Sequence, residues 1–303
     1  MEVLITGGLG FVGTQLSIRL LERGHQVTVV DRSPEPGAHT PQQVKYLSAD
    51  TTVQGPWQDE VARQDAVINL AGASIFRRWD PKTKQLISDS RVLTTGNIVE
   101  AISHDKGARV LCSTSAVGYY GFRGDEALSE GDSPGTDFLS QVCIDWEDEA
   151  KKAAKKGARV VVTRFGIVLG KTGGALGQMI PAFKKFAGGP LGSGKQWFSW
   201  IHMADLVEAF MFVFDNQDIH GPVNFCSPNP IRNKDLAKAL GATLSRPSFV
   251  KTPAFMLRLV LGEFGSVLLE GQRVFPTKLL DHGFRFHHPE IKGALEDILG
   301  KRA

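Results

Sequence analysis

The chain has 303 residues, of which 42% are hydrophobic and 22% are charged, a composition typical of a soluble globular protein without long disordered regions. Its formal net charge of +3 is too small to indicate a nucleic-acid partner. We also expect no membrane partner and a cytoplasmic location, because the chain starts with a strand and its late apolar stretch PAFMLRLVLGEFGSVLL is interrupted by Arg258, Glu263 and two glycines.

The three cysteines, Cys112, Cys143 and Cys226, lie far apart and show no metal-ligand spacing. We therefore expect buried free thiols in a reducing compartment and no metal site.

Apolar runs of strand length alternate with segments of helical periodicity in the first half of the chain. The expected strands are EVLIT, QVTVV, VKYLS, AVINLAG, RVLCSTS and RVVVTRF, and the expected helices cover residues 11–23, 82–104 and 138–156. Continuous β-branched runs separated by helices are typical of strands that are buried on both faces of a parallel sheet. We predict an α/β fold with a Rossmann-type doubly wound parallel sheet over residues 1–170.

After residue 170 the pattern changes to Gly- and Pro-rich loops and short helices, with one more strand candidate at PVNFC. Residues 171–303 therefore predict a smaller C-terminal α/β lobe on the substrate side. Within it, residues 200–227 are expected to pack back onto the main sheet.

The first predicted strand runs directly into the glycine-rich segment TGGLGFVG. Gly8, Gly10 and Gly13 match a dinucleotide-binding pattern, and the segment lies between a predicted strand and a predicted helix. In that context the backbone N–H groups and the helix N-terminus bind a pyrophosphate, whereas a tight turn without a ligand is the competing interpretation. The residues expected to hold the cofactor are Gly7, Gly8, Gly10, Phe11, Val12 and Gly13.

The second predicted strand ends at Asp31 and Arg32, which point to different cofactors. An acidic residue about 20 positions after the glycines accepts hydrogen bonds from an adenosine ribose and favours NAD. The guanidinium of Arg32 instead favours the 2′-phosphate of NADP. A solvated Asp–Arg pair without either role is the third interpretation.

The motifs TGGLGFVG, VINLAG, STSAVGYYG, RFGIVLG and FSWIHMADL follow one another in this order. With them the chain resembles the extended short-chain dehydrogenase/reductase proteins, the nucleotide-sugar epimerase and dehydratase relatives. Its later segments GGPLGSGKQWFSWIHMADL, GPVNFCSPNPIRN and LLEGQRVFPTKLLDHGFRF are similar to the atypical epimerase family branch (SDR39U1/YfcH-like), which ends in a domain of unknown function.

The resemblance implies roles for individual residues. It favours NADP narrowly over NAD, because close members carry an arginine at the position of Arg32. Ser115 falls where relatives place the residue that hydrogen-bonds a substrate hydroxyl. The resemblance also implies four further positions near the cofactor: Asp50 beside the adenine, and Asn69, Ala71 and Gly72 after the fourth strand.

Typical members place a Tyr and a Lys four residues apart on the helix after the Ser strand, where the lysine lowers the pKa of the tyrosine for proton exchange. The corresponding helix here reads DFLSQVCIDWEDEA. The pair falls either on Leu139 and Cys143 or on Gln141 and Asp145, so neither alignment restores it.

Tyr119, Tyr120 and His202 are the expected replacement proton donors, although packed rings with bonded hydroxyls would explain the tyrosines as well. The sequence therefore predicts an NAD(P)-binding atypical short-chain dehydrogenase/reductase, acting as an oxidoreductase or epimerase on a small polar or nucleotide-linked substrate. The alternative is a non-catalytic NAD(P)H-sensing regulatory or interaction protein. Lys195 and Gln196 either bind an anionic substrate group or lie on the surface, and a homodimer is left open.

Overall fold

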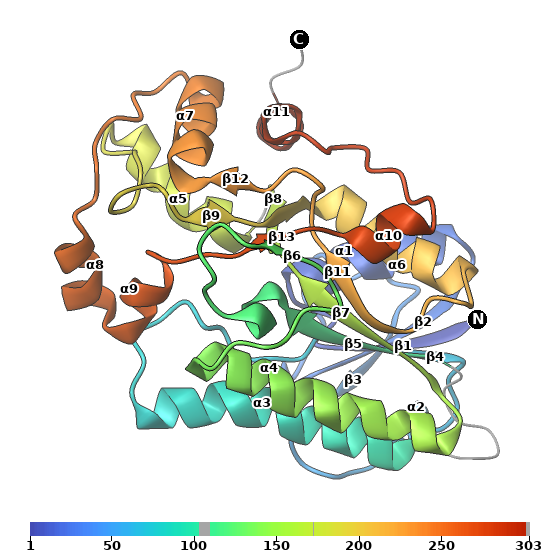
Figure 1. The fold of residues 1–303 in the computed structure, drawn as a ribbon. Coiled ribbons are helices and arrows are strands. Elements are labelled where there is room, and N and C mark those ends of the chain that lie inside the picture. Colours follow the sequence, from blue (N-terminus) through green and yellow to red (C-terminus); the bar gives the residue numbers. More distant parts are fainter. Residues whose placement is uncertain (103–109, 172, 301–303) are drawn as a thin grey trace.

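The computed structural model describes residues 1–102, 110–171 and 173–300, and it is built around a seven-stranded parallel sheet (Figure 1). The strand order is β11-β7-β5-β4-β1-β2-β3. Chain growth reverses direction between β1 and β4, which is the switch point where open α/β sheets bind their ligands. The strands are β1 (Glu2–Thr6), β2 (Gln26–Asp31), β3 (Lys45–Ser48), β4 (Ala66–Asn69), β5 (Val110–Ala116), β7 (Arg159–Phe165) and β11 (Gly221–Phe225).

The central strands are apolar on both faces because helices cover the sheet on both sides. Leu4 and Ile5 of β1 and their neighbours Val67 and Ile68 of β4 have no exposed surface. Successive residues of a strand point to opposite faces, so full burial of consecutive residues requires two helical layers. The predicted α/β fold with a doubly wound parallel sheet is therefore confirmed.

The two helical layers come from different parts of the chain (Figure 1). On one face, Leu16 and Leu20 of α1 (Phe11–Glu22) pack with Leu206 and Phe210 of α6 (Met203–Asp215) in one core cluster. The other face is covered by α2 (Trp57–Val61), α3 (Pro81–Ala101) and α4 (Phe138–Lys151), and the 3-10 helix η2 (Lys152–Lys156) follows α4.

Local sequence signals set the starts of the long helices. Asp80 accepts a hydrogen bond from the N–H of Thr83 at 2.7 Å, and Pro81 occupies the first turn of α3. Asp137 caps α4 in the same way. Helix α3 ends at Ala101 rather than at residue 104 as predicted, and residues 103 and 104 lie outside the described residues.

The smaller lobe is built from short two-stranded sheets and short helices. Its core contains Trp200, Leu236 and Leu295, none of which is exposed. The strand pairs are β8 (Ile167–Gly170) with β10 (Trp200–His202), β9 (Trp197–Phe198) with β12 (Ile231–Arg232), and β6 (Ala127–Leu128) with β13 (Arg273–Val274). The helices are α5 (Gly174–Lys184), α7 (Asn233–Leu244), α8 (Ala254–Leu261), α9 (Glu263–Val267), α10 (Thr277–Asp281) and α11 (Ile291–Leu299).

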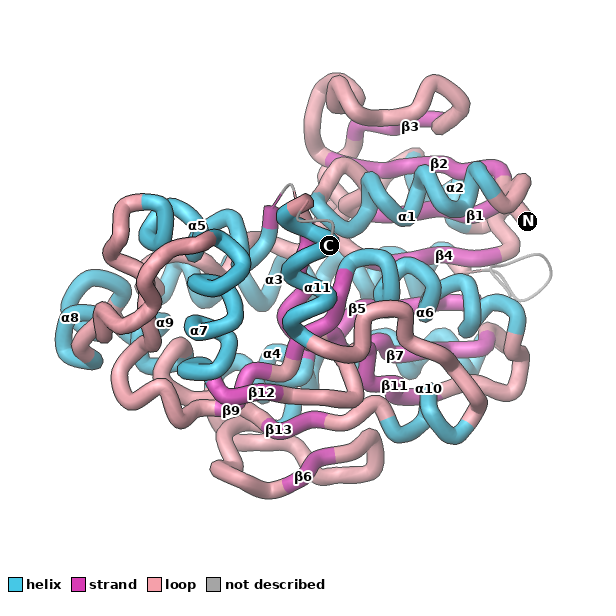
Figure 2. The backbone as a smooth tube through the Cα atoms, turned by 90° about the horizontal axis from the view of Figure 1, so that it is seen from above, coloured by secondary structure: helices cyan, strands magenta, loops and turns pink. Residues whose placement is uncertain are grey.

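The smaller lobe lies at the carboxyl ends of the parallel strands. In Figure 2 the strands run from the N-terminal side of the molecule toward α5 and α7, and α11 lies between α7 and α6. Two segments, α6 and β11, return from the lobe to the main sheet, where β11 pairs with β7. The lobe therefore faces the edge of the sheet at which ligands of α/β proteins bind.

Two further expectations can be compared with the structure. All three cysteines are buried and free, as predicted. Within the described ranges, no helix combines the length and the apolar character needed to cross a membrane.

Candidate active site

The glycine loop between β1 and α1 is closely packed at three of its four glycines. Gly7 has φ of +68°, and a Cβ atom there would lie 2.9 Å from the backbone N and Cα of Ala71. A Cβ at Gly8 would lie 2.6 Å from Val29, and one at Gly13 would lie 2.6 Å from the Cα of Gly8. These three glycines therefore let the loop, the helix and the neighbouring strands approach one another.

Gly10 differs from the other three glycines because the protein leaves its open side unfilled. Among the described residues other than its two chain neighbours, the carbonyl oxygen of Gly7, at 3.1 Å, is the one atom within 4 Å of a Cβ built there. Its φ of −71° and ψ of 175° suit any residue. The backbone conformation therefore does not require a glycine, and the missing side chain leaves room for a ligand.

Helix α1 begins at Gly10 without a side-chain cap. The N–H groups of its first turn, at Phe11, Val12 and Gly13, have no acceptor within the helix. Such a terminus attracts an anion, since the helix dipole and the unpaired N–H groups point the same way. An uncapped first turn beside the open face of Gly10 fits the pyrophosphate of a dinucleotide.

The ring of Phe11 closes the loop against the smaller lobe. Cβ atoms built at Gly170, Gly173 and Gly174 would lie 2.8–3.0 Å from this ring. Phe11 therefore has a packing role across the two parts of the molecule. Its backbone N–H is the part that remains available to a phosphate.

The residues predicted to surround the adenosine lie together at the ends of β2 and β3. Asp31 accepts a hydrogen bond from the N–H of Leu9 at 3.2 Å and is partly exposed. Arg32 is exposed, and its charge helps to lower the pKa of Asp50, although hydrogen bonds from Thr52 have the larger effect on that pKa. The structure thus brings Arg32 near Asp50. Both lie where we expect the adenosine end of the cofactor, at which NAD and NADP differ.

Asn69 does not line the cleft, contrary to the expectation. It has no exposed surface, and its Oδ1 accepts hydrogen bonds from the Thr6 hydroxyl at 2.7 Å and the Ala71 N–H at 3.3 Å. Its Nδ2 donates to the Thr95 hydroxyl at 2.8 Å. Asn69 therefore holds the turn after β4, whereas Ala71 and Gly72 in the same turn keep exposed surface.

Ser115 is also turned away from the cleft. Its side chain is 1% exposed, and its hydroxyl donates to Oε1 of Glu147 at 2.7 Å. Both oxygens of Glu147 accept hydrogen bonds from the Arg164 guanidinium at 2.8 Å, in a pair with almost no exposed side-chain surface. Ser115 therefore helps to satisfy a buried ion pair, and in this arrangement its hydroxyl is engaged by Glu147, so the expected contact with a substrate hydroxyl stays a prediction.

Tyr120 belongs to the same buried network. Its hydroxyl accepts a hydrogen bond from Arg164 at 2.9 Å and donates one to Asn224 at 2.7 Å. The residue has no exposed surface, and burial raises the pKa of its phenol above its ordinary value. These contacts favour the structural interpretation of Tyr120, and its role as a proton donor stays a prediction.

His202 caps a helix instead of facing the cleft. Its Nδ1 accepts the N–H of Ala204 at 3.1 Å at the start of α6, and Nε2 lies 3.3 Å from Asp297, a long contact. Burial, together with the nearby His288, lowers the pKa of His202 to about 4. His202 is therefore neutral near pH 7, which disfavours the predicted role as a proton donor to substrate.

The hydrogen bond that His202 accepts also argues against a metal ion beside this residue. One donor atom each from His202, His288 and Asp297 would lie within 4.8 Å of the others. Because Nδ1 of His202 accepts a backbone N–H, the neutral ring carries its proton on Nε2. The nitrogen that faces the other two groups has no lone pair to offer a cation.

Tyr119 is the remaining candidate for proton exchange. Its ring is partly exposed, and the Arg164 guanidinium carbon lies 3.5 Å from the ring centroid. Its hydroxyl makes no hydrogen bond with a residue in the described part of the chain. Among the four expected catalytic residues, Tyr119 alone keeps a hydroxyl that is not already engaged.

The structure distinguishes the two alignments of helix α4. Cys143 lies against the end of β5, with Sγ 3.9 Å from the Ala116 carbonyl, and Leu139 lies 3.7 Å from a Cβ built at Gly118. Gln141 and Asp145 point to solvent and hydrogen-bond to each other at 2.8 Å. Leu139 and Cys143 therefore face the end of β5, and Gln141 and Asp145 do not. Burial raises the pKa of the Cys143 thiol to about 11, which excludes a ready thiolate.

Arg91 is a residue of the site that sequence reasoning missed. It projects from α3, and a Cβ built at Gly72 would lie 3.0 Å from its guanidinium carbon. Its NH2 donates to the Ala73 carbonyl at 3.2 Å. Its charge offsets a small part of the rise that burial causes in the pKa of the Cys143 thiol. Arg91 makes no ion pair with a described residue, and burial lowers its own pKa. A cation from α3 therefore lies at the turn after β4, within electrostatic range of Cys143 on α4.

A second group of cations lies where β9, β12 and β13 meet. The guanidinium carbons of Arg232 and Arg273 lie 3.9 and 4.9 Å from the centroid of the Trp197 ring. Asp125 pairs with Arg232 at 2.5 Å and accepts the Trp197 indole N–H. Arg273 forms no ion pair within the described ranges, and its buried Nε has no hydrogen-bond partner there. This cluster is suited to an anionic group.

Lys195 and Gln196, for which two interpretations were open, differ from each other. The Gln196 amide donates to two backbone carbonyls, at 3.0 and 3.2 Å, so this residue holds the loop. Lys195 is exposed and precedes the cluster around Trp197.

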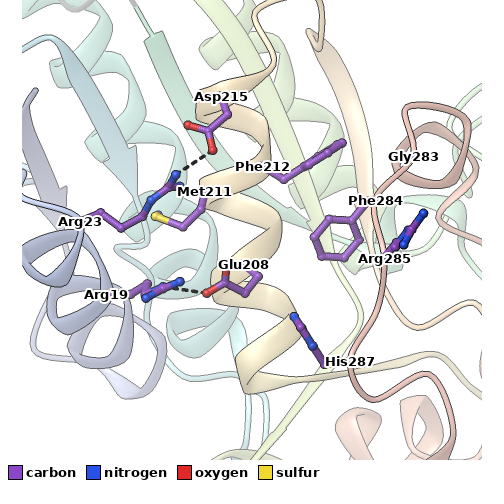
Figure 3. A pocket seen from close by; sticks show the side chains of 10 residues that line it. All are labelled: Arg19, Arg23, Glu208, Met211, Phe212, Asp215, Gly283, Phe284, Arg285 and His287. Atoms are coloured by element: carbon purple, nitrogen blue, oxygen red, sulfur yellow. Dashed lines mark hydrogen bonds and ion pairs between the residues drawn. The ribbon is translucent and has the colours of Figure 1, made fainter.

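A separate shallow pocket lies at the other end of α1, between α6 and residues 283–287 (Figure 3). Arg19 pairs with Glu208 at 2.7 Å, and Arg23 pairs with Asp215 at 2.9 Å. These arginines are at the carboxyl end of the helix and are already matched by carboxylates. The pocket is therefore not part of the candidate active site.

Comparisons with known proteins identify relatives that match nearly the whole chain. Residues 3–225 match the NAD dependent epimerase/dehydratase family, and residues 252–298 match a domain of unknown function, DUF1731. The chain is 41% identical over 302 residues to the chloroplastic epimerase family protein SDR39U1 homolog of Arabidopsis thaliana, covering 99% of this chain and 87% of that protein.

Two further relatives cover the chain equally well. An epimerase family protein of Staphylococcus haemolyticus is 39% identical over 300 residues, with 98% of this chain and 99% of that protein covered. The crystal structure of human epimerase family protein SDR39U1 (isoform 2) with NADPH has a TM-score of 0.87 and 33% identity, and each chain is covered completely.

Proposed function

Because the chain belongs to the NAD dependent epimerase/dehydratase family, we propose that it is an NADP(H)-binding oxidoreductase or epimerase in which other residues replace the usual Tyr–Lys pair. The observation that carries this proposal is the uncapped start of α1 beside the open face of Gly10. The likeness to a human relative crystallised with NADPH supports the choice of cofactor.

The residues that would hold the cofactor follow from the loop geometry. The first-turn N–H groups of α1 would bind the pyrophosphate, and Arg32 would bind the 2′-phosphate with two charge-assisted hydrogen bonds. Asp31 leaves one carboxylate oxygen for the ribose, because the other already accepts the Leu9 N–H. When bound, the nicotinamide would supply hydride-transfer chemistry.

The acid–base groups would come from different elements than in typical relatives. Arg91 would provide from α3 the positive charge that the lysine provides from α4, since it lies between Gly72 and Cys143. Tyr119 would carry the exchanging proton on its hydroxyl. Cys143 and Leu139 would exclude water from this side, because both lie against the end of β5.

The substrate would carry an anionic group, as a phosphorylated or nucleotide-linked molecule does. Arg273 has no carboxylate partner in the described part of the chain, and Lys195 is exposed near it. An unmatched guanidinium beside an aromatic ring recognises a phosphate well, because its N–H groups bind two oxygens at once.

A non-catalytic NADPH sensor is the second candidate. The specific observation in its favour is that Leu139 and Cys143, which cannot form an activated phenol and its cationic neighbour, are the α4 residues that face the end of β5. In that case cofactor occupancy would set the conformation without turnover.

Single-turnover oxidation of bound NADPH, followed by absorbance over a panel of phosphorylated and nucleotide-linked carbonyl compounds, tests the proposal. Tyr119→Phe should slow oxidation by about 10²-fold or more, and Arg91→Gln should also slow it, while calorimetry shows that both variants still bind NADPH. Tyr120→Phe is the matched control and should leave the rate of the folded enzyme near that of the wild type. Tight NADPH binding without oxidation of any compound would favour the sensor.

A further inference from the structure

Helix α8 presents apolar side chains to solvent. None of its eight residues is buried. Leu259 is 73% exposed, Phe255 68%, Val260 64% and Met256 46%. Single exposed apolar residues are ordinary on a protein surface, but four on one short helix are not, since contiguous apolar patches mark interaction sites.

The four exposed side chains lie on one face of the helix. Ala254, Leu257 and Leu261 are half-buried and face the rest of the lobe. At about 100° per residue, positions 255, 259, 256 and 260 span a continuous arc of about 140° on the other side. Arg258 projects at the edge of this arc. The helix therefore has two apolar faces, one directed toward the lobe and one directed outward.

The apolar face continues onto the neighbouring loops. Phe249 is 78% exposed and Phe186 is 59% exposed. The N–H of Val250 donates to the Gly188 carbonyl at 3.2 Å, which joins the loop before α8 to the loop after α5. Figure 1 shows α8 at the outer edge of the lobe, away from the main sheet. We call this the α8 surface, formed by Phe186, Phe249, Phe255, Met256, Leu259 and Val260.

The α8 surface is held in place by the adjoining helix α9. Phe264 of α9 is 4% exposed and packs against Trp79, with ring centroids 5.6 Å apart. Lys84 of α3 also pairs with Glu263 at 2.6 Å. The outward face is thus a feature of the folded lobe and not of a frayed segment.

Basic residues are frequent in the segments that carry the α8 surface. Residues 236–262 contain no Asp or Glu but four basic residues, and Lys184 and Lys185 directly precede Phe186. None of these cations forms an ion pair within the described ranges. The four basic residues are Lys238, Arg246, Lys251 and Arg258.

Although the sequence led us to expect no membrane partner, we propose that the α8 surface binds an anionic lipid bilayer, with α8 lying in the plane of the interface. Exposed aromatic and aliphatic side chains with a basic rim are the composition of interfacial helices, in which apolar burial and attraction to acidic headgroups add. Eight residues span about 12 Å, so the helix lies on a membrane and does not cross it.

A second copy of the chain fits this surface less well. In a two-fold contact the same patch meets itself, so the two basic rims would come together. Like charges opposed across an interface weaken association. A negatively charged lipid surface instead complements every cation in the rim.

Sedimentation with vesicles of phosphatidylcholine and phosphatidylserine in equal amounts tests the proposal on the full chain. We expect binding that weakens with added salt and is lost with phosphatidylcholine alone. Phe255→Ser/Leu259→Ser and Lys251→Glu/Arg258→Glu should each lower the partition coefficient about tenfold or more. Val53→Ser/Leu280→Ser, at two exposed apolar residues elsewhere, is the matched control and should bind like the wild type.

A fluorescent label reports insertion directly, because the three native cysteines are buried. An environment-sensitive dye on Leu259→Cys should shift to shorter wavelength with acidic vesicles, and the same dye on Val53→Cys should not. No vesicle binding, or binding that both α8 double variants leave unchanged, overturns the proposal. Self-association in ultracentrifugation that Phe255→Ser/Leu259→Ser abolishes, without vesicle binding, would assign the surface to a second copy instead.

Discussion

The turn after β1 and the turn after β5 both carry motifs of the family, but they are built in opposite ways. After β1, Gly10 leaves an open face and α1 begins with unpaired N–H groups. After β5, the motif residues Ser115 and Tyr120 are buried and their hydroxyls are already bonded. The first turn is arranged to receive a ligand, whereas the second is arranged around the Glu147–Arg164 pair. The same kind of family motif can therefore form an open turn at one strand end and a buried hydrogen-bond network at another.

Removing the cation of the buried pair should have the largest effect. Arg164→Met leaves the Glu147 carboxylate buried without its cation and with the Ser115 hydroxyl as its remaining described side-chain donor, so we expect the free energy of unfolding to fall by about 3–5 kcal/mol in urea titrations. The double variant Arg164→Met/Glu147→Leu is the control and should recover part of the loss. A single variant as stable as the wild type would mean that the turn after β5 is not organised by this pair.

Filling the open face of Gly10 tests the other turn. Gly10→Val should lower the NADPH affinity at least about 100-fold by calorimetry, because the side chain occupies the pyrophosphate position. The backbone angles at Gly10 suit valine, so the thermal midpoint should change little. Unchanged affinity in a folded variant would remove the contrast between the two turns.

The third prediction concerns how protein stability depends on pH through His202. Its pKa is about 4 in the folded protein and about 6.5 when unfolded, so the unfolded state binds the extra proton first. Stability should therefore be intact above pH 6.5 and fall as the pH decreases from 6.5 toward 4, by about 2 kcal/mol between pH 7.5 and pH 5. His202→Asn, which keeps a capping acceptor, should flatten this part of the urea-midpoint profile. An equally steep profile in that variant would assign the pH dependence to other groups.

The smallest effect concerns cofactor choice at the open turn. Arg32→Ala should lower the ratio of NADPH to NADH affinity about tenfold, because two charge-assisted hydrogen bonds to the 2′-phosphate are lost. Calorimetry with both nucleotides gives the ratio. An unchanged ratio would show that Asp31 decides the preference and would reverse the expectation of NADP.

The sheet and the glycine loop could be predicted because their signals are local. β-branched runs indicate buried strands, and Gly8, Gly10 and Gly13 lie within one turn. Arg91 could not be found this way, since it meets Gly72 and Cys143 only after α3 and α4 pack together. The burial of Ser115 was equally hidden, because it depends on Glu147, 32 residues away.

The late apolar stretch shows a different limit of sequence reasoning. Its composition excludes a spanning helix, but periodicity alone does not say whether a face points inward or outward. That depends on which element packs against it, and α9 covers only one side of α8.

The buried network after β5 also constrains the order in which the chain can fold. Tyr120 bonds to Asn224, and Glu130 accepts the N–H groups of Asn224 and Lys278 at 3.0 and 3.2 Å. Contacts of such long sequence separation form late, whereas β1 and β2 can pair as soon as the first helix has formed. During synthesis the nucleotide-binding half would therefore emerge and collapse with its Arg164 region incomplete. We therefore expect the hydrogen bonds of Tyr120 and Glu130 to be completed only after the C-terminal family domain has left the ribosome.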